Sequence, residues 1–195
     1  MNTVVIIPAR AGSKRLKGKN RRKLKKKPLI NWTIDFAQKL SFVDDIILTT
    51  NDKIIMKIVK KYNIKVLKRS SKLSKDKTKT IDVIFDVLKK YENKKYKIQN
   101  IILLQITSPF RSKKIIEYAY KRYIKNKKKK SIISINNTKD TNLNGNFYIA
   151  SKKFLNKNKS FISKKNTIPI KLHSKRLKID IDTKKDFQIA KSLIN

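Results

Sequence analysis

The chain alternates between short apolar runs rich in β-branched residues and longer segments whose apolar residues recur at helical spacing. The short runs predict strands at residues 3–7, 45–50, 64–68, 100–105, 131–135, 144–150 and 177–182. The helical spacing predicts helices at residues 29–40, 52–63, 80–91, 113–125 and 183–195. Asp52 precedes the second helix as a cap, and Asp182 or Thr183 stands at the start of the last. Strands that alternate with helices favour an α/β fold with a doubly wound, mostly parallel sheet.

Nothing along the chain marks a boundary between domains. Its 195 residues suffice for one domain with a buried core, and we find no internal repeat and no linker. No apolar run is long enough to cross a bilayer, and no signal peptide precedes the first predicted strand. The absence of cysteine excludes disulfides and thiolate metal sites. We therefore expect a single domain over residues 1–195 and a cytoplasmic protein.

The chain is strongly basic, with 52 Lys and Arg against 13 Asp and Glu, a net charge of +39. One explanation is nucleic-acid binding, because phosphate contacts use Lys and Arg. The other is the composition of an AT-rich genome, since Lys, Ile and Asn are abundant while Gly and Trp are scarce. The lysines are spread over nearly every segment rather than gathered on one tail, which favours the second explanation. We expect no specific nucleic-acid partner and no membrane partner, only weak adventitious RNA binding.

Unusual polar residues follow three of the predicted strands, at residues 10–20, 107–111 and 180–186. Ligands of parallel sheets bind at the carboxyl ends of the strands. We therefore expect these three segments to lie on one side of the molecule and to form one site.

The first of these segments follows the stretch VVIIP and reads ARAGSKRLKGKN. Gly12 lets the backbone approach a bulky anion, and Ser13 supplies a hydroxyl and its own N–H. Arg10, Lys14 and Lys19 can converge on phosphate oxygens. The spacing is neither that of a Walker A loop nor GxGxxG. By residue type alone, the segment is either a phosphate-binding loop or a basic loop of a basic protein.

Asp180 and Asp182 are two carboxylates at the end of the last predicted strand. Alternation along a strand would put both on one face, where they suit a magnesium ion that also touches phosphates. The alternative is that Asp182 only caps the last helix, with Asp186 in its first turn favouring the helix dipole. The two roles are compatible.

The segment LLQITSPFR places Gln105, Thr107, Ser108 and Arg111 just past a buried strand. Gln105 either contacts a ligand or hydrogen-bonds the loop backbone. Arg111 either pairs bidentately with a substrate carboxylate or is a surface arginine. His173, the only histidine, gives little support for serine-hydrolase or zinc chemistry.

These segments together resemble the acylneuraminate cytidylyltransferases, the family of the CMP-sialic, pseudaminic and legionaminic acid synthetases. The stretch IIPARAGSKRLKGKN looks like the nucleotide-binding signature of that family, IPARxGSKR followed by KN. Further blocks follow in the order of the family: KPLINWTI, LTTND, RSSKLSKDKTKTIDVI, LLQITSPFR, NGNFYI and IDIDTKKDF. They cover nearly the whole chain.

The resemblance implies a Rossmann-like fold of the nucleotide-diphospho-sugar transferase type and a nucleotidyl transfer. In that reaction the anomeric hydroxyl of a nine-carbon 2-keto sugar acid attacks the α-phosphorus of CTP with Mg²⁺, and pyrophosphate leaves. Carried over by position, it implies catalytic roles for Arg10 and Lys19 and magnesium ligation by Asp180 and Asp182. The implied nucleotide-binding residues are Ala9, Arg10, Gly12, Ser13, Lys14, Lys19, Asn20, Arg69 and Thr80. The implied sugar-binding residues are Gln105, Thr107, Ser108 and Arg111.

Two other functions compete with this one. A related sugar nucleotidyltransferase that uses 3-deoxy-manno-octulosonic acid has the same chemistry, but the complete GSKRLxGKN motif argues against it. The other alternative is a degenerate or nucleic-acid-binding member that keeps the fold without the activity.

The sequence also departs from the pattern of the family. Four motif positions carry a different residue, which we interpret as drift: Lys26, Asn51, Ser70 and Ile106. The largest departure lies at residues 136–144, where the family carries an extension that swaps into a partner subunit. Only nine residues join the flanking strands here. We therefore expect any homodimer to form without the usual swapped segment.

Overall fold

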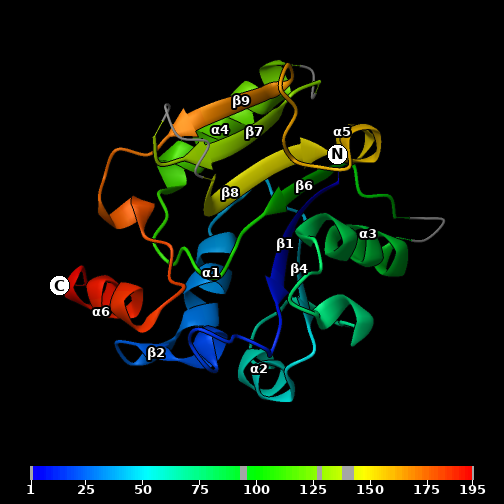
Figure 1. The fold of residues 1–195 in the computed structure, drawn as a ribbon. Coiled ribbons are helices and arrows are strands. Elements are labelled where there is room, and N and C mark those ends of the chain that lie inside the picture. The colour runs from blue at the N-terminus through cyan, green and yellow to red at the C-terminus, as the bar shows by residue number, and fades with distance from the viewer. Residues whose placement is uncertain (1, 93–95, 127–128, 138–142, 195) are drawn as a thin grey trace.

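A seven-stranded sheet runs through the computed structural model, which describes residues 2–92, 96–126, 129–137 and 143–194 (Figure 1). The strand order is β5-β4-β1-β6-β8-β7-β9. In chain order the strands are β1 (Thr3–Ala9), β4 (Asp45–Thr50), β5 (Lys65–Lys68), β6 (Asn100–Leu103), β7 (Ser131–Ile135), β8 (Leu143–Ser151) and β9 (Thr167–Lys171). A separate two-stranded ribbon joins β2 (Lys23–Leu24) to β3 (Lys27–Pro28).

The sheet is mostly parallel, as the sequence predicts. β1 pairs in parallel with β4 and β6, β4 with β5, and β7 with β9. Strand β8 pairs antiparallel with both β6 and β7. The carboxyl ends of β1, β4 and β6 therefore meet at one edge of the sheet, where ligands of α/β folds bind.

Helices cover both faces of the sheet, and Figure 1 shows α1 and α3 on opposite sides of β1. The helices are α1 (Leu29–Ala37), α2 (Lys53–Val59), α3 (Thr80–Tyr91), α4 (Lys113–Lys125), α5 (Lys152–Asn158) and α6 (Lys184–Ser192). Val5 and Ile7 of β1 pack in one core with α1, α2, α4 and α6. Val4 and Ile6 pack in a second core with α3 and α5. This alternation is what a strand buried on both faces requires.

The predicted strand at 177–182 is wrong. The structure has a 3-10 turn, η3 (Arg176–Lys178), followed by an extended segment without a strand partner in the described chain. Side chains fix its backbone instead: the amides of Asn146 and Asn144 donate to the carbonyls of Leu177 and Lys178. Its alternating apolar residues pack on the core beside α6, and this burial gives the segment a strand-like pattern.

The sequence analysis did not predict two of the elements, β9 and α5. Strand β9 contains Pro169, which cannot donate to a ladder and is tolerated because β9 lies at the edge of the sheet. Helix α5 buries only Phe154 and Leu155, too few to show helical spacing. Its start is set by Ser151, whose hydroxyl accepts from the N–H of Phe154 at 3.0 Å.

The predicted caps are confirmed. The Asp52 carboxylate accepts from the N–H groups of Ile54 and Ile55, and α2 begins at Lys53. Thr183, rather than Asp182, caps α6, in a capping box with Asp186. Helices α1 and α2 end at Ala37 and Val59, a turn earlier than predicted. No helix in the described part of the chain has the length and apolar character needed to cross a membrane.

The short connection predicted at 136–144 falls mostly on residues 138–142, which lie outside the described residues. Its two ends are described and lie together. Ile135 of β7 pairs with Leu143 of β8, and Nδ2 of Asn144 donates to Oδ1 of Asn136 at 2.7 Å. The strands are thus adjacent where the connection leaves and re-enters the sheet.

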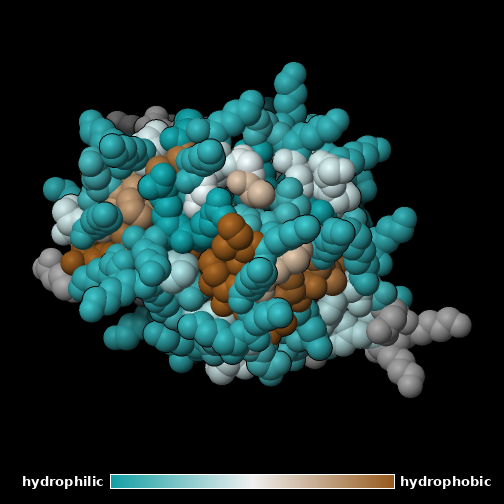
Figure 2. Space-filling model, turned by 90° about the horizontal axis from the view of Figure 1, so that it is seen from below, coloured by the Kyte–Doolittle hydropathy of each residue, from teal (hydrophilic) through white to brown (hydrophobic). Residues whose placement is uncertain are grey.

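The surface at the carboxyl ends of β1 and β4 is predominantly hydrophilic. Figure 2 views the molecule from this side and shows hydrophilic residues over most of it, with apolar patches between them. Over the whole described surface, the exposed large apolar side chains are Ile54, Val66, Tyr118, Ile162 and Ile189.

Candidate functional site

Two adjoining cavities lie at the carboxyl edge of the sheet. The inner one, of about 180 Å³, is lined by the first loop, by residues 69–80 and by the end of β6. The outer one, of about 330 Å³, is lined by the first loop together with Asp76 and Asp182. Arg10, Ser13 and Lys19 line both cavities. The three segments predicted to form one site therefore do meet.

Most of the predicted site residues line these cavities. They are Arg10, Ser13, Lys14, Lys19, Asn20, Arg69, Thr80, Gln105, Thr107 and Asp182. Ala9 and Ser108 are buried beneath the edge, and Gly12 is exposed in the loop. Arg111 and Asp180 occupy different positions, described below.

The first loop is fixed by two asparagines. Nδ2 of Asn20 donates to the carbonyl of Arg10 at 3.0 Å. Oδ1 of Asn51, at the end of β4, accepts from the N–H of Ala11 at 2.9 Å. The sequence singled out Asn51 only as a departure from the family pattern, yet its side chain holds the loop backbone in place.

Gly18 gives the loop its turn. Its φ is +65°, in the left-handed region, and a Cβ there would meet Nε of Arg21 at 2.8 Å. A Cβ on Gly12 would meet nothing within 4 Å. The backbone at Gly12 thus faces open space that an anion can enter.

Four basic side chains of the loop form ion pairs with two aspartates, which offset half of their charge. Arg10 and Lys14 pair with Asp76, with Nζ of Lys14 at 2.7 Å from Oδ2. Arg15 and Lys19 pair with Asp182, at 2.5 and 2.7 Å. Phosphate oxygens can take the place of these carboxylates, because both are oxygen anions that accept charge-assisted hydrogen bonds.

Arg69 is buried at the inner cavity. Its guanidinium donates to the carbonyl of Leu73, with Nε at 2.8 Å. Burial, together with the charge of Arg10, lowers the pKa of Arg69. Two guanidinium groups therefore lie close enough to repel each other, a situation that a polyanionic ligand relieves.

Gln105 lies against the backbone of β8. Its N–H donates to the carbonyl of Gly145 at 3.2 Å. A Cβ at Gly145 would meet Oε1 of Gln105 at 2.5 Å. The glycine of the NGNFYI block thus makes room for the side chain of Gln105 at the cavity wall.

Arg111 faces away from both cavities. It donates to the carbonyls of Asn146 and Gln105, at 2.8 and 2.5 Å, and to Oγ1 of Thr33 at 3.2 Å. Burial lowers the pKa of Arg111 to about 9. It lines a separate cavity of about 410 Å³ on the α1 side. The bidentate contact predicted with a substrate carboxylate would require these bonds to break.

Asp180 is half-buried behind the cavity edge. Its Oδ1 is buried, and the hydroxyl of Thr107 lies beside the carboxylate; neither atom has another hydrogen-bond partner in the described chain. The N–H of Ile181 donates to the carbonyl of Thr107 at 2.7 Å and fixes this arrangement. Burial raises the pKa of Asp180. A buried carboxylate whose only neighbouring donor among the described residues is one hydroxyl group suits a cation.

The donor set fits a magnesium ion that shares its ligands with a nucleotide. No group of three or more His, Cys, Asp or Glu residues able to hold a metal occurs among the described residues. Mg²⁺ is commonly held by one or two carboxylates, with phosphates and water completing an octahedron. Asp180 and Asp182, which interact electrostatically, supply that number. Strand alternation, the predicted reason for their proximity, does not apply here.

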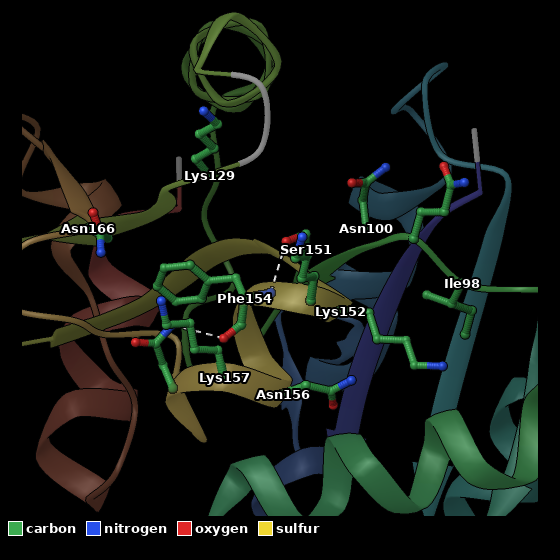
Figure 3. Close-up of a pocket in the computed structure, with 12 residues that line it drawn as sticks. Ile98, Asn100, Lys129, Ser151, Lys152, Phe154, Asn156, Lys157 and Asn166 are labelled. Atoms are coloured by element: carbon green, nitrogen blue, oxygen red, sulfur yellow. Dashed lines mark hydrogen bonds between the residues drawn. The ribbon is translucent and has the colours of Figure 1, made fainter.

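A larger cavity, of about 900 Å³, lies at the opposite edge of the sheet, where β6 begins and β8 ends (Figure 3). Two of the polar groups that line it bond within the protein: Lys152 pairs with Glu92, and Asn100 accepts from the hydroxyl of Tyr123. Figure 3 shows the bond that joins Ser151 to Phe154 at its wall. None of the predicted site residues lines it. Volume alone therefore does not identify the site.

Comparison with known proteins agrees with the resemblance seen in the sequence. Residues 4–194 match the family model described as Cytidylyltransferase. The CMP-N,N'-diacetyllegionaminic acid synthase of Legionella pneumophila is 34 % identical over 227 residues, covering 100 % of this chain and 97 % of that protein. The pseudaminic acid cytidylyltransferase of Campylobacter jejuni is 31 % identical over 130 residues, covering 66 % of this chain and 56 % of that protein.

The Legionella alignment is longer than this chain, 227 positions against 195 residues, so the relative has residues without a counterpart here. Among solved structures, CMP:2-keto-3-deoxy-manno-octonic acid synthetase complexed with CTP has a TM-score of 0.75 at 15 % identity, with 100 % of this chain and 98 % of that one covered. A cytidylyltransferase from Leptospira borgpetersenii has a TM-score of 0.76 at 20 % identity, with 100 % and 87 % covered. These structures confirm the predicted fold.

Proposed function

Because this chain belongs to the cytidylyltransferase family, we propose that it transfers CMP from CTP to the anomeric hydroxyl of a nonulosonic, sialic-acid-like sugar. A relative matched over 97 % of its length, at 34 % identity, is a CMP-N,N'-diacetyllegionaminic acid synthase. The observation that carries the proposal is the basic loop at the carboxyl end of β1. There, Arg10, Ser13 and Lys19 line both cavities at the edge of the sheet.

The reaction is a displacement at phosphorus. The hydroxyl oxygen of the sugar bonds to the α-phosphorus of CTP, and its proton passes to water. The bond between the α-phosphorus and the oxygen that bridges to the β-phosphate breaks, and its electron pair leaves with pyrophosphate. Catalysis of such a transfer depends on positioning and on balancing charge.

The basic side chains of the loop would bind the triphosphate. Lys19 is only 12 % exposed and points toward Asp182, so its charge is held at the junction of the two cavities. Arg10 lies on the other side of the loop with Arg69 close behind it. Together, the cationic side chains of Lys19, Arg10 and Arg69 can hold the α-phosphate and the departing phosphates in one orientation. The open backbone at Gly12 and the hydroxyl of Ser13 would complete the cradle.

Asp180 and Asp182 would hold Mg²⁺. When bound, the ion would neutralise phosphate charge and polarise the α-phosphate. In this structure Asp182 pairs with Lys19 and Arg15. Nucleotide binding would draw these two cations to phosphate and leave the carboxylate free for the metal.

The sugar would bind beside Gln105 and Thr107, which line the inner cavity. Ser108 lies behind them, with its hydroxyl buried. We place Arg111 outside this contact set, as a support for the loop. The single-domain organisation, the shortened 136–144 connection, a dimer without the swapped segment and a cytoplasmic location belong to the same proposal.

The test is a turnover assay. The purified chain is incubated with CTP, Mg²⁺ and a panel of acceptors that includes legionaminic, pseudaminic and N-acetylneuraminic acids and 3-deoxy-manno-octulosonic acid. We expect pyrophosphate release with at least one nonulosonic acid, and none without acceptor. Release only with 3-deoxy-manno-octulosonic acid would support the related transferase. No release with any acceptor would overturn the proposal.

A further inference from the structure

Asp76 has no role in the proposed chemistry, yet it binds two of the side chains that the chemistry uses. It follows the turn η2 (Lys72–Ser74) and lines the outer cavity together with Asp182. Its Oδ1 pairs with Nη1 of Arg10, and its Oδ2 pairs with Nζ of Lys14 at 2.7 Å. Each carboxylate oxygen thus takes one cation, as two oxygens of a phosphate group would.

From this geometry we propose that Asp76 is a displaceable counter-ion, which gives up Arg10 and Lys14 to CTP and takes them back as pyrophosphate leaves. The inference rests on the proposed function for the identity of the anions. It assigns Asp76 a positioning role that favours product release. It involves no contact between Asp76 and the reacting atoms.

The segment that carries the carboxylate is held by hydrogen bonds before and around Asp76. Before it, the guanidinium of Arg69 holds the carbonyl of Leu73. Around it, the N–H of Thr78 donates to the carbonyl of Lys75 at 3.2 Å and closes a turn that contains Asp76. Lys75 and Thr78 themselves line the inner cavity. Asp76 therefore stands at a fixed place on the wall of the phosphate site.

The two pairs are suited to exchange. The side chains of Lys14 and Asp76 are 83 % and 38 % exposed, so water competes for both. Exposed ion pairs of this kind contribute little to stability. Lys14 and Arg10 hold the pKa of Asp76 below its ordinary value, so the carboxylate stays charged at neutral pH. A polyphosphate brings more charge than one carboxylate and displaces it.

A counter-ion that competes for a ligand's partners weakens the binding of that ligand and raises its rate of departure. In a chain with a net charge of +39, pyrophosphate would otherwise be held by an uncompensated cluster of cations. By competing for these cations, Asp76 speeds the release of pyrophosphate and so favours turnover. Removing its charge should therefore tighten anion binding, the opposite of what loss of a ligand-binding residue does.

The experiment measures the affinity of the full chain for inorganic pyrophosphate by titration calorimetry, without sugar. The variants are Asp76→Asn, Asp76→Glu and the control Glu117→Gln, which removes the same charge from a pair with Lys113 on α4. We expect Asp76→Asn to bind pyrophosphate about fivefold tighter and Asp76→Glu to bind as the parent does. The control should not change, and the difference should shrink as salt is added. In turnover, Asp76→Asn should lower the KM for CTP and lower kcat.

Unchanged or weaker binding of pyrophosphate by a folded Asp76→Asn protein would overturn the inference. An equal gain in Glu117→Gln would also overturn it, because net charge alone would then explain the effect. The two proposals fail separately. If no acceptor supports turnover, the transferase function falls while calorimetry still decides whether Asp76 competes with the anion. If turnover is normal and Asp76→Asn changes no affinity, only the role of Asp76 falls.

Discussion

Nζ of Lys19 lies 2.7 Å from Oδ1 of Asp182, although the two residues are 163 positions apart in the sequence. This pair joins the first loop to the segment before α6 and closes the site across the edge of the sheet. It links a predicted phosphate-binding cation to a predicted magnesium ligand. Under the proposed function, Lys19 would exchange Asp182 for phosphate, and Asp182 would exchange Lys19 for the metal ion.

The first prediction concerns Asp182. We expect Asp182→Ala to lower Mg²⁺-dependent turnover by about 100-fold or more, because the loss removes charge stabilisation at the transferring phosphate. The thermal midpoint should stay close to that of the parent, because its ion pairs are partly exposed and Thr183 rather than Asp182 caps α6. Pyrophosphate release and thermal unfolding measure the two effects.

The matched control for that variant is Asp35→Ala. Asp35 pairs with Lys27 and lies on the separate cavity of the α1 side. The Asp35→Ala protein should release pyrophosphate at the rate of the parent. Unchanged turnover in Asp182→Ala would contradict a role for Asp182 in metal binding. Its only role would then be to pair with Lys19 and Arg15.

The second prediction concerns the buried carboxylate of Asp180. Its pKa is raised by burial, so the folded protein holds this proton at a pH where the unfolded chain has lost it. Stability therefore falls as pH rises from the ordinary Asp value of 3.8 through the raised pKa. Asp180→Asn should remove this cost. Without Mg²⁺ we expect a gain of about 1 kcal/mol near pH 7, or roughly 2–4 °C in the thermal midpoint.

The pH dependence of the gain in stability shows whether the charge of the buried Asp180 carboxylate causes it. The gain should be full above the raised pKa of Asp180 and should shrink as the pH falls toward 3.8. The same variant should lose Mg²⁺-dependent turnover. Thermal melts over a pH series, paired with the pyrophosphate assay, check both results. A variant less stable than the parent near pH 7 would show that the charge of Asp180 is compensated in the folded protein.

The third prediction compares two glycines of the first loop. Gly18→Ala should cost about 1 kcal/mol of stability, because φ of +65° disfavours any side chain and a Cβ would meet Arg21. Gly12→Ala should leave the free energy of unfolding nearly unchanged, because its Cβ would meet nothing. It should weaken CTP binding about tenfold, because the methyl group would fill the space that we assign to phosphate. Denaturant melts and CTP titrations measure these effects. Unchanged CTP affinity in Gly12→Ala would place the phosphates elsewhere.

Most of the fold could be predicted from sequence because burial on both faces of the sheet leaves a local signal. Val4 to Ile7 form an apolar run, since each side chain reaches one of two cores. The segment at 177–182 gave a false signal because its apolar residues pack on a core without a neighbouring strand. Strand β9 gave no strand signal, because it contains Pro169, which is compatible only with an edge strand. Which strand lies at an edge is known only once the order of the strands in the sheet is known.

The site was predictable to the extent that position at a strand end determines it. The ion pairs between the loop and the two aspartates could not be predicted from the sequence. Asp76 and Asp182 lie 66 and 167 positions from Arg10 and Arg15, with which they form ion pairs. Asn51 was interpreted as drift, because nothing local shows that its oxygen accepts from Ala11. Arg111 has the residue type of a carboxylate ligand, and only the tertiary structure shows that its donors are used within the protein.

The last prediction tests that position of Arg111. Its guanidinium ties the end of β6 to β8 by donating to the carbonyls of Gln105 and Asn146. Arg111→Ala removes a charged donor from both carbonyls, and the carbonyl of Gln105 keeps the weaker bond from the N–H of Ser108 at 3.3 Å. We expect a loss of about 3 kcal/mol of stability, while the folded protein at low temperature keeps the KM of the parent for the sugar acid. Arg176→Ala is the control, since Arg176 lines the same cavity over Phe110 but is exposed, and it should cost little. Denaturant melts and sugar titrations measure the two effects. A large rise in KM with unchanged stability would instead place Arg111 against the substrate.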